Sequence, residues 1–197
     1  MTASSPVGDG RFRCPWALSA PDYVQYHDAE WGRPIRDDNG LFERLTLEAF
    51  QSGLSWLTIL RKREGFRAAF AGFDIAAVAA FDDGDRDRLL ADAAIVRNRA
   101  KIDAAITNAR AAKALDEGLA TLVWSLAPLR TTPPGRLDDV PARTPESTAL
   151  AAALKRRGFA FVGPTTGYAL MQAAGLVNDH LADCWVRAEI ERQREAG

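Results

Sequence analysis

The sequence predicts an all-α fold, and three observations support that fold class. Ala, Leu, Arg and Glu dominate the chain, and Val, Ile and Thr are not gathered into the alternating runs typical of strands. Apolar residues recur at helical spacing in successive segments. The chain has 197 residues, of which 47% are hydrophobic, so it is long enough to bury a core. Because no internal repeat is apparent, we expect one helical domain rather than a solenoid.

Capping and helix-breaking residues define the first group of predicted helices. Asp38 or Asn39 can cap a helix that begins near Leu41. Gly53 interrupts that helix, and Ser55 can cap the next one. The helices expected after this break cover residues 56–62, 64–70, 74–81, 85–93 and 98–117.

Prolines define the second group. Five prolines between residues 127 and 147 predict a loop with few regular elements. Thr144 can then cap a helix that starts with Pro145 and ends at Gly158. The helices expected in this part of the chain cover residues 145–157 and 164–175, and a last one begins near Asn178.

The chain divides into three expected segments. Residues 1–11 are small and polar and predict a flexible N-terminal segment, residues 12–186 a single domain, and residues 187–197 a charged tail. No apolar run approaches the roughly 18 residues of a membrane span, and no signal peptide is apparent. We therefore expect a monomeric cytoplasmic protein with reduced thiols and no membrane partner.

The only two cysteines and only two histidines form one pair near each end of the chain. Twelve residues separate Cys14 from His27, and three separate His180 from Cys184, which would face one way on a helix. Two thiolates and two imidazoles suit a closed, structural zinc site, which would join the two ends of the chain. A catalytic zinc is disfavoured because no ligand position remains for water. The alternative is two buried thiols and two unrelated histidines, and spacing leaves both interpretations open.

Aromatic residues and one carboxylate suggest a binding pocket. Trp16, Tyr23, Tyr26 and Trp31 lie close to the first Cys/His pair, either as core residues or as a stacking pocket for a flat ring. Glu48 lies at the flank of the apolar sector of its helix. Its carboxylate is therefore either solvated or buried for a purpose.

A turn between two predicted helices suggests contact with DNA. Lys155 and Arg156 end one helix, and backbone N–H groups around Gly163 begin the next, an arrangement that can receive a phosphate. The alternative is an ordinary pair of antiparallel helices. The formal net charge of −1 gives no global indication of a nucleic-acid partner, so this local motif carries the argument.

Taken together, these segments resemble the 3-methyladenine DNA glycosylase I family of the helix-hairpin-helix DNA-repair superfamily. The resemblance covers about residues 12–185 and rests on four stretches: CPW with YHDAEWG, LFERLTLEAFQSGLSWLTILRKRE, IVRNRAKIDAAITNA and KRRGFAFVGPTTGYALMQAAGLVNDHLADC. It implies a helix-hairpin-helix over about residues 145–176. It also implies one structural zinc bound by Cys14, His27, His180 and Cys184, and a base pocket formed by Trp16, Tyr23, Glu48 and Trp56.

The implied activity is monofunctional hydrolysis of the N-glycosidic bond of 3-methyladenine in double-stranded alkylated DNA, by base flipping and with free 3-methyladenine as product. Glu48 would be the catalytic residue, accepting hydrogen bonds from the amino edge of the base. Leu54 either packs in the core or fills the gap left by the flipped base. Lys155, Arg156 and Gly163 would contact the DNA backbone.

Two positions near the second Cys/His pair bear on the chemistry. Many relatives in the superfamily carry a catalytic Asp where this chain has Asn178, so the resemblance implies a substrate activated by its own charge. The neighbouring Asp179 would serve the helix start or orient His180.

Two other function classes remain open. One is a catalytically silent helix-hairpin-helix zinc protein that binds DNA structure without excision. The other is a zinc hydrolase with an unrelated substrate, which a closed set of four ligands disfavours.

Overall fold

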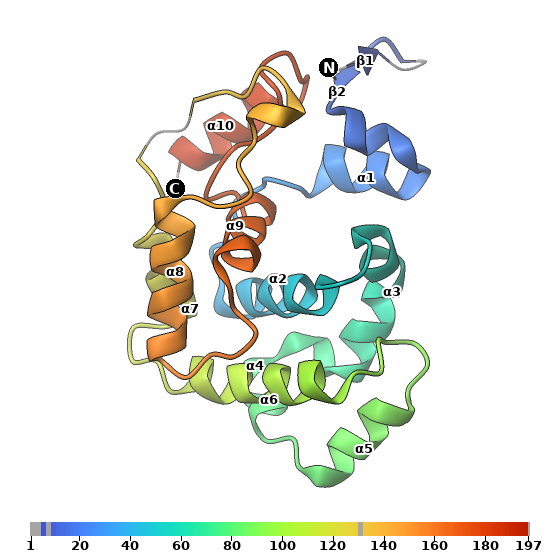
Figure 1. The fold of residues 1–197 in the computed structure, drawn as a ribbon, viewed down its shortest axis with the longest axis vertical. Helices are drawn as coiled ribbons and strands as arrows, with labels where there is room; N and C mark the ends of the chain where they lie inside the picture. The colour runs from blue at the N-terminus through green and yellow to red at the C-terminus, as the bar shows by residue number, and fades with distance from the viewer. Residues whose placement is uncertain (1–4, 7–8, 130–131, 197) are drawn as a thin grey trace.

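The computed structural model describes residues 5–6, 9–129 and 132–196, and within these ranges the chain is almost entirely helical (Figure 1). The one strand pair of the described residues joins β1 (Ser5–Pro6) to β2 (Phe12–Arg13) in antiparallel register. The all-α prediction is confirmed. The flexibility predicted for residues 1–11 falls partly on residues outside the described ranges. No helix in the described ranges is long and apolar enough to span a membrane.

The described α-helices run as follows: α1 Pro21–Ala29, α2 Asp38–Gln51, α3 Trp56–Ala69, α4 Ile75–Ala79, α5 Asp83–Ala91, α6 Arg99–Lys113, α7 Leu119–Trp124, α8 Pro145–Arg156, α9 Pro164–Ala173 and α10 Arg187–Glu195. Short 3₁₀ turns cover Pro15–Ser19, Ala71–Phe73 and Leu137–Asp139.

Two of the predicted caps are confirmed, and one is wrong. The Ser55 and Thr144 hydroxyls each accept a hydrogen bond from the backbone N–H three residues ahead, at the starts of α3 and α8. Helix α2 is capped one residue earlier than expected, because Asp37 accepts from the Gly40 N–H at 2.7 Å. The Asp38 carboxylate instead accepts from the Ala120 N–H in α7, a helix that the sequence pattern did not predict.

The two segments expected at residues 56–62 and 64–70 form one helix, α3. Gly65 lies inside this helix, and a Cβ there would lie 2.7 Å from the Ala94 carbonyl oxygen. The close approach of these two backbones therefore accounts for a glycine at this helical position.

The helix expected from Asn178 is also wrong, since residues 178–186 form turns and α10 begins at Arg187. Successive side chains in this segment point to different partners: Asn178 to Glu191 in α10, Asp179 to Tyr168 in α9. These side-chain contacts to α9 and α10 hold the segment in turns.

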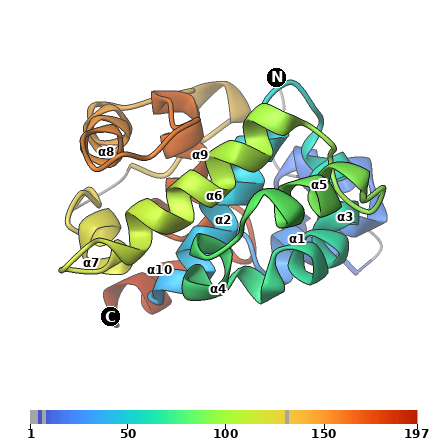
Figure 2. The same ribbon diagram turned by 90° about the horizontal axis from the view of Figure 1, so that it is seen from below.

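Helix α2 is the central element, and α3, α6, α7 and α9 pack around it (Figures 1 and 2). Its buried face joins a core rich in phenylalanine, whose fully buried members are Phe42, Phe50, Phe66, Phe70 and Phe73. A smaller apolar cluster lies at the other end of the molecule, where the N-terminal segment meets α10. It contains Cys14, Leu181, Cys184, Val186 and Ile190, so the predicted charged tail contributes a buried side chain.

Two glycines with positive φ allow a test of this packing. Gly175 follows α9 with φ +76°, and a Cβ there would lie 2.6 Å from the Gly32 carbonyl oxygen, whereas a Cβ at Gly158, with φ +86°, would meet only the Ala111 Cβ, at 4.0 Å. We expect Gly175→Ala to lower the free energy of unfolding by roughly 3 kcal/mol or more and Gly158→Ala by about 1 kcal/mol. Urea denaturation of the two variants measures the difference, and equal losses would contradict the close approach.

Candidate functional site

The two Cys/His pairs meet in one buried cluster. The ligand atoms of Cys14, His27, His180 and Cys184 all lie within 4.8 Å of one another and could hold a metal ion. The Cys184 Sγ lies 3.4 Å from His27 Nε2 and 3.5 Å from His180 Nδ1. The Cys14 thiol and the two imidazoles hold the pKa of Cys184 well below its usual range, which favours the thiolate that a metal requires. The alternative of unrelated thiols and histidines is wrong.

Hydrogen bonds outside the cluster orient both imidazoles. His27 Nδ1 lies 2.8 Å from the Asp28 carboxylate, and His180 Nε2 lies 3.0 Å from the Trp31 carbonyl oxygen. With one nitrogen of each ring donating to these acceptors, His27 Nε2 and His180 Nδ1 are left facing the cluster. The predicted role of Asp179 in orienting His180 is therefore wrong, because Trp31 holds that position.

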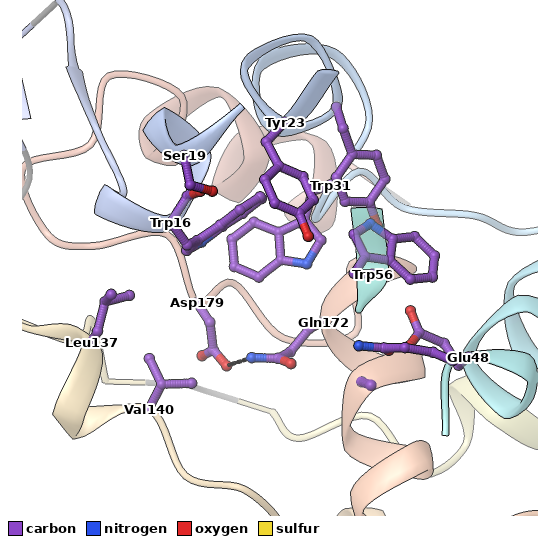
Figure 3. Close-up of a pocket in the computed structure, with 13 residues that line it drawn as sticks. Trp16, Ser19, Tyr23, Trp31, Glu48, Trp56, Leu137, Val140, Gln172 and Asp179 are labelled. Atoms are coloured by element: carbon purple, nitrogen blue, oxygen red, sulfur yellow. Dashed lines mark hydrogen bonds between the residues drawn. The ribbon is translucent and has the colours of Figure 1, made fainter. Parts of the chain in front are cut away.

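A cavity of about 430 Å³ lies beside the cluster, between α1, α2, α3 and α9 (Figure 3). The four residues expected to form a base pocket, Trp16, Tyr23, Glu48 and Trp56, all line it. The walls also include residues that the sequence did not single out for this role or left undecided: Tyr26, Trp31, Gln51, Gln172 and Asp179.

The aromatic walls pack mainly edge to face. The Trp16 ring lies 5.0 Å from Trp31 and 5.7 Å from Tyr23, and the Tyr26 ring lies 5.4 Å from Trp56. The Trp16 ring also contacts His27, at 5.3 Å between centroids, so the metal-ligand cluster supports the cavity directly. The rings hold one another in place and leave an open space of the size that a flat heterocycle needs.

Two buried polar groups of the cavity have no hydrogen-bond partner among the described residues. Glu48 is 7% exposed and accepts no hydrogen bond from them, and the Trp56 Nε1–H is buried without an acceptor. Figure 3 shows Glu48 beside Trp56, across the cavity from Trp16. A solvated Glu48 is excluded. Because buried polar groups are normally paired, this acceptor and this donor are available to a ligand.

Burial raises the pKa of Glu48 to about 8, and the positive charge of Arg44 opposes that rise. The Arg44 guanidinium lies behind the Tyr26 ring, 5.5 Å from its centroid, and shares Glu30 with Arg63. Arg44 and Arg63 together with Glu30 leave a net positive charge behind Tyr26. Ionised Glu48 would neutralise that charge, so the two arginines favour the ionised form of the carboxylate in the cavity.

On the wall opposite Glu48, Asp179 accepts hydrogen bonds from the Tyr168 hydroxyl at 2.7 Å and from Gln172 Nε2 at 2.9 Å. Asn178 does not line the cavity, and its amide donates to Glu191 and to the Arg187 carbonyl oxygen. The Asp179 carboxylate thus faces the cavity, and the Asn178 amide faces α10.

The helices α8 and α9 form the expected hairpin. Lys155 and Arg156 are exposed at the end of α8, and Gly163 caps α9 with no atom within 4 Å of the position of a Cβ. The turn is fixed by Asn108, whose side-chain amide both accepts from and donates to the backbone of Ala160. The backbone at Gly163 is therefore open to an approaching group.

Leu54 lies in the short loop between α2 and α3 and is 41% exposed. The interpretation that Leu54 packs in the core is therefore wrong. The sequence signal for the remaining cavity residues was weak, although Tyr26 adjoins the ligand His27 and Trp31 lies four residues further on.

Comparisons with known proteins agree with this geometry. A family model described as methyladenine glycosylase matches residues 16–188. DNA-3-methyladenine glycosylase 1 of Escherichia coli (strain K12) is 48% identical over 177 residues, covering 87% of this chain and 95% of the relative. The DNA-3-methyladenine glycosylase of Haemophilus influenzae is 44% identical over 178 residues, covering 87% of this chain and 96% of the relative. A solved structure of 3-methyladenine DNA glycosylase I from Staphylococcus aureus, which addresses 3-methyladenine recognition, matches with a TM-score of 0.84 at 34% identity, over 89% of this chain and 96% of that one.

The burial of Glu48 predicts a pH-dependent stability difference. The folded protein binds the Glu48 proton more tightly than the unfolded chain, whose carboxyl has a pKa near 4.5. The stability from the neutral side chain is complete below that value and is lost as the pH rises toward 8. We expect Glu48→Gln to raise the free energy of unfolding by roughly 1–3 kcal/mol at pH 8.5 and to change it little at pH 5.

Denaturation curves at the two pH values measure this difference. The exposed Glu64, on α3, provides the control, because Glu64→Gln should give the same small effect at both pH values. A Glu48→Gln effect independent of pH would contradict the raised pKa.

Proposed function

The chain belongs to the methyladenine glycosylase family, and from this premise we propose that it hydrolyses the N-glycosidic bond of 3-methyladenine in alkylated double-stranded DNA. The product is free 3-methyladenine. The observation that carries the proposal is the aromatic cavity, in which the buried Glu48 carboxylate and the Trp56 Nε1–H have no hydrogen-bond partner among the described residues. A monomeric state and a cytoplasmic location stay predictions.

The chemistry needs little from the protein beyond recognition and charge. Methylation at N3 leaves the base with a positive charge, and when the C1′–N9 bond breaks, its electron pair goes to the base, which leaves as a neutral molecule. The sugar becomes oxocarbenium-like, and water adds to C1′ and loses a proton to solvent. No strong general acid is required, because the leaving group is already activated. We propose that the reaction is monofunctional, as the family resemblance implies.

We assign recognition of the base to four residues. Glu48 accepts hydrogen bonds from the amino edge of the flipped adenine and stabilises its positive charge. Trp16 and Trp56 stack on the cationic ring, which favours the charged base over a neutral one. Tyr23 completes the polar edge, and Tyr26, which lies against Trp56, adds a further aromatic wall.

We assign the DNA contacts to two surfaces. The exposed side chains of Lys155 and Arg156, with the open backbone at Gly163, suit the phosphates of one strand. The exposed Leu54 suits an apolar wedge that fills the gap left by the flipped base.

We also propose that the Cys/His cluster holds one structural zinc. A tetrahedral zinc with bonds of about 2.0–2.3 Å separates its ligand atoms by roughly 3.3–3.8 Å. The separations of 3.2, 3.4, 3.5 and 3.9 Å found within the cluster fit that geometry. Four protein ligands leave no position for a reacting water, so the ion would link the two ends of the chain and take no part in hydrolysis.

A silent protein that binds DNA without excision would have no use for this cavity. In such a protein, no bound ligand would offset the free-energy cost of burying a carboxylate and an indole N–H without hydrogen-bond partners. The unpartnered groups therefore favour the enzyme over the silent alternative.

The activity is tested with Glu48→Gln. The substitution keeps the shape of the side chain but removes its charge, and a charged hydrogen bond in a desolvated site contributes roughly 1.5–3 kcal/mol. We expect single-turnover release of 3-methyladenine from methylated DNA to fall about ten- to a hundredfold. Glu43→Gln, on the same helix but paired with Arg67 outside the cavity, should keep the wild-type rate. Wild-type release by folded Glu48→Gln would remove Glu48 from the mechanism.

The metal is tested separately. Purified protein should contain one zinc per chain, and Cys184→Ala should lose both the ion and roughly 2 kcal/mol or more of the free energy of unfolding. The exposed neighbour Asp183 gives the matched control, because Asp183→Ala removes no ligand. Elemental analysis and thermal denaturation measure the two quantities. Purified protein with well under one zinc per chain would disprove the assignment.

A further inference from the structure

We infer that Lys101 is a positioning residue that fixes the loop between α2 and α3 at the edge of the base pocket. The loop comprises residues 52–55. Gln51, the last residue of α2, lies in the wall of the cavity, and Leu54 is exposed three residues later. The inference rests on the proposed function, because it concerns the same cavity and the same wedge.

The contacts of Lys101 are made to the loop backbone. Its Nζ donates to the Phe50 carbonyl oxygen at 2.9 Å and to the Ser52 carbonyl oxygen at 2.5 Å. These carbonyls flank Gln51, at the point where α2 ends. One ammonium group therefore spans the residue that turns from the helix into the loop.

These two bonds complete the hydrogen bonding of the helix end. The last carbonyls of a helix have no partner within it, and here the Gln51 carbonyl accepts from the Leu54 N–H at 2.7 Å. The Lys101 Nζ donates to the carbonyl oxygens of Phe50 and Ser52, on either side of Gln51. The next residue, Gly53, adopts φ +80° and has no atom within 4 Å of the position of a Cβ. Neighbouring side chains therefore give the loop little support at Gly53.

The placement of the charge is unusual for a lysine that only stabilises its own helix. Lys101 lies in the first turn of α6, where the helix dipole disfavours a cation. It is 8% exposed, and no carboxylate pairs with it among the described residues. Burial lowers its pKa. The favourable site for its charge is the C-terminal end of α2, so its side chain is directed to that end by the electrostatics of two helices.

The consequence for the proposed reaction is mechanical. A wedge residue can fill the gap in a duplex only if its own backbone stays in place when the bases are displaced. Lys101 holds the loop backbone in place without contacting the base, since Lys101 is not among the residues that line the cavity. Removing it should impair the flipped complex in DNA and leave the pocket able to bind free base.

The test compares Lys101→Met, Leu54→Ala and the double variant. Methionine keeps the length of the apolar stem but removes the donors. We expect single-turnover excision from duplex DNA to fall about tenfold for Lys101→Met, with the affinity for free 3-methyladenine unchanged. In the double variant the Lys101 substitution should add less than about twofold, because Lys101 acts through the loop that carries Leu54. Lys101→Arg, which keeps charge and donors, should recover most of the rate.

Hydrogen exchange gives a readout that does not depend on activity. The Ser52 and Leu54 amides should exchange faster in Lys101→Met than in the wild type, while amides of α9 are unchanged. Independent, multiplicative losses in the double variant, or unchanged exchange in the loop, would overturn the inference. If the wild type releases no 3-methyladenine, the proposed function fails, and the exchange measurement still decides whether Lys101 holds the loop.

Discussion

The meeting of the two Cys/His pairs is the constraint on which the rest of the structure depends. Cys14 and His180 are 166 positions apart, so their contact closes most of the chain into one loop. Two walls of the cavity are attached to this closure. Trp16 follows Cys14 by two residues, and the Trp31 carbonyl receives the hydrogen bond from His180. A structural zinc at this place would therefore hold the aromatic pocket together as well as the chain ends, although it lies outside the proposed chemistry.

Much of the site was predictable because its chemistry needs rare residue types. Two cysteines and two histidines in the whole chain leave one way to form a four-residue cluster, and the dense aromatics beside Cys14 identify one wall. Helix capping by Ser55 and Thr144 was equally clear, because each side chain bonds a backbone group three residues away. Local signals of this kind do not depend on the tertiary structure.

The features that could not be predicted depend on segments far apart in the sequence. The burial of Glu48 comes from Tyr26 and Trp56, which cover α2 from α1 and α3, and no periodicity within α2 reveals that cover. The turns of residues 178–186 depend on contacts with α9 and α10, which override an apparently helical spacing. Lys101 looks like a surface lysine in the sequence, because the helix end that it caps lies about 50 residues earlier.

The charges around the cavity explain how a buried carboxylate can select a cationic base. Ionised Glu48 is costly without a ligand, as its raised pKa indicates, and the positive charge behind Tyr26 compensates only part of that cost. A cationic base in the cavity provides the remaining electrostatic stabilisation of ionised Glu48, because it lies next to the carboxylate and against the faces of Trp16 and Trp56. A neutral adenine of nearly the same shape provides no such stabilisation. It also lacks the positive charge that makes the base leave. In the proposed reaction, recognition and activation therefore depend on the same property of the lesion. A pocket of this kind needs neither a strong acid nor a metal-bound water to act on damaged bases and spare normal ones.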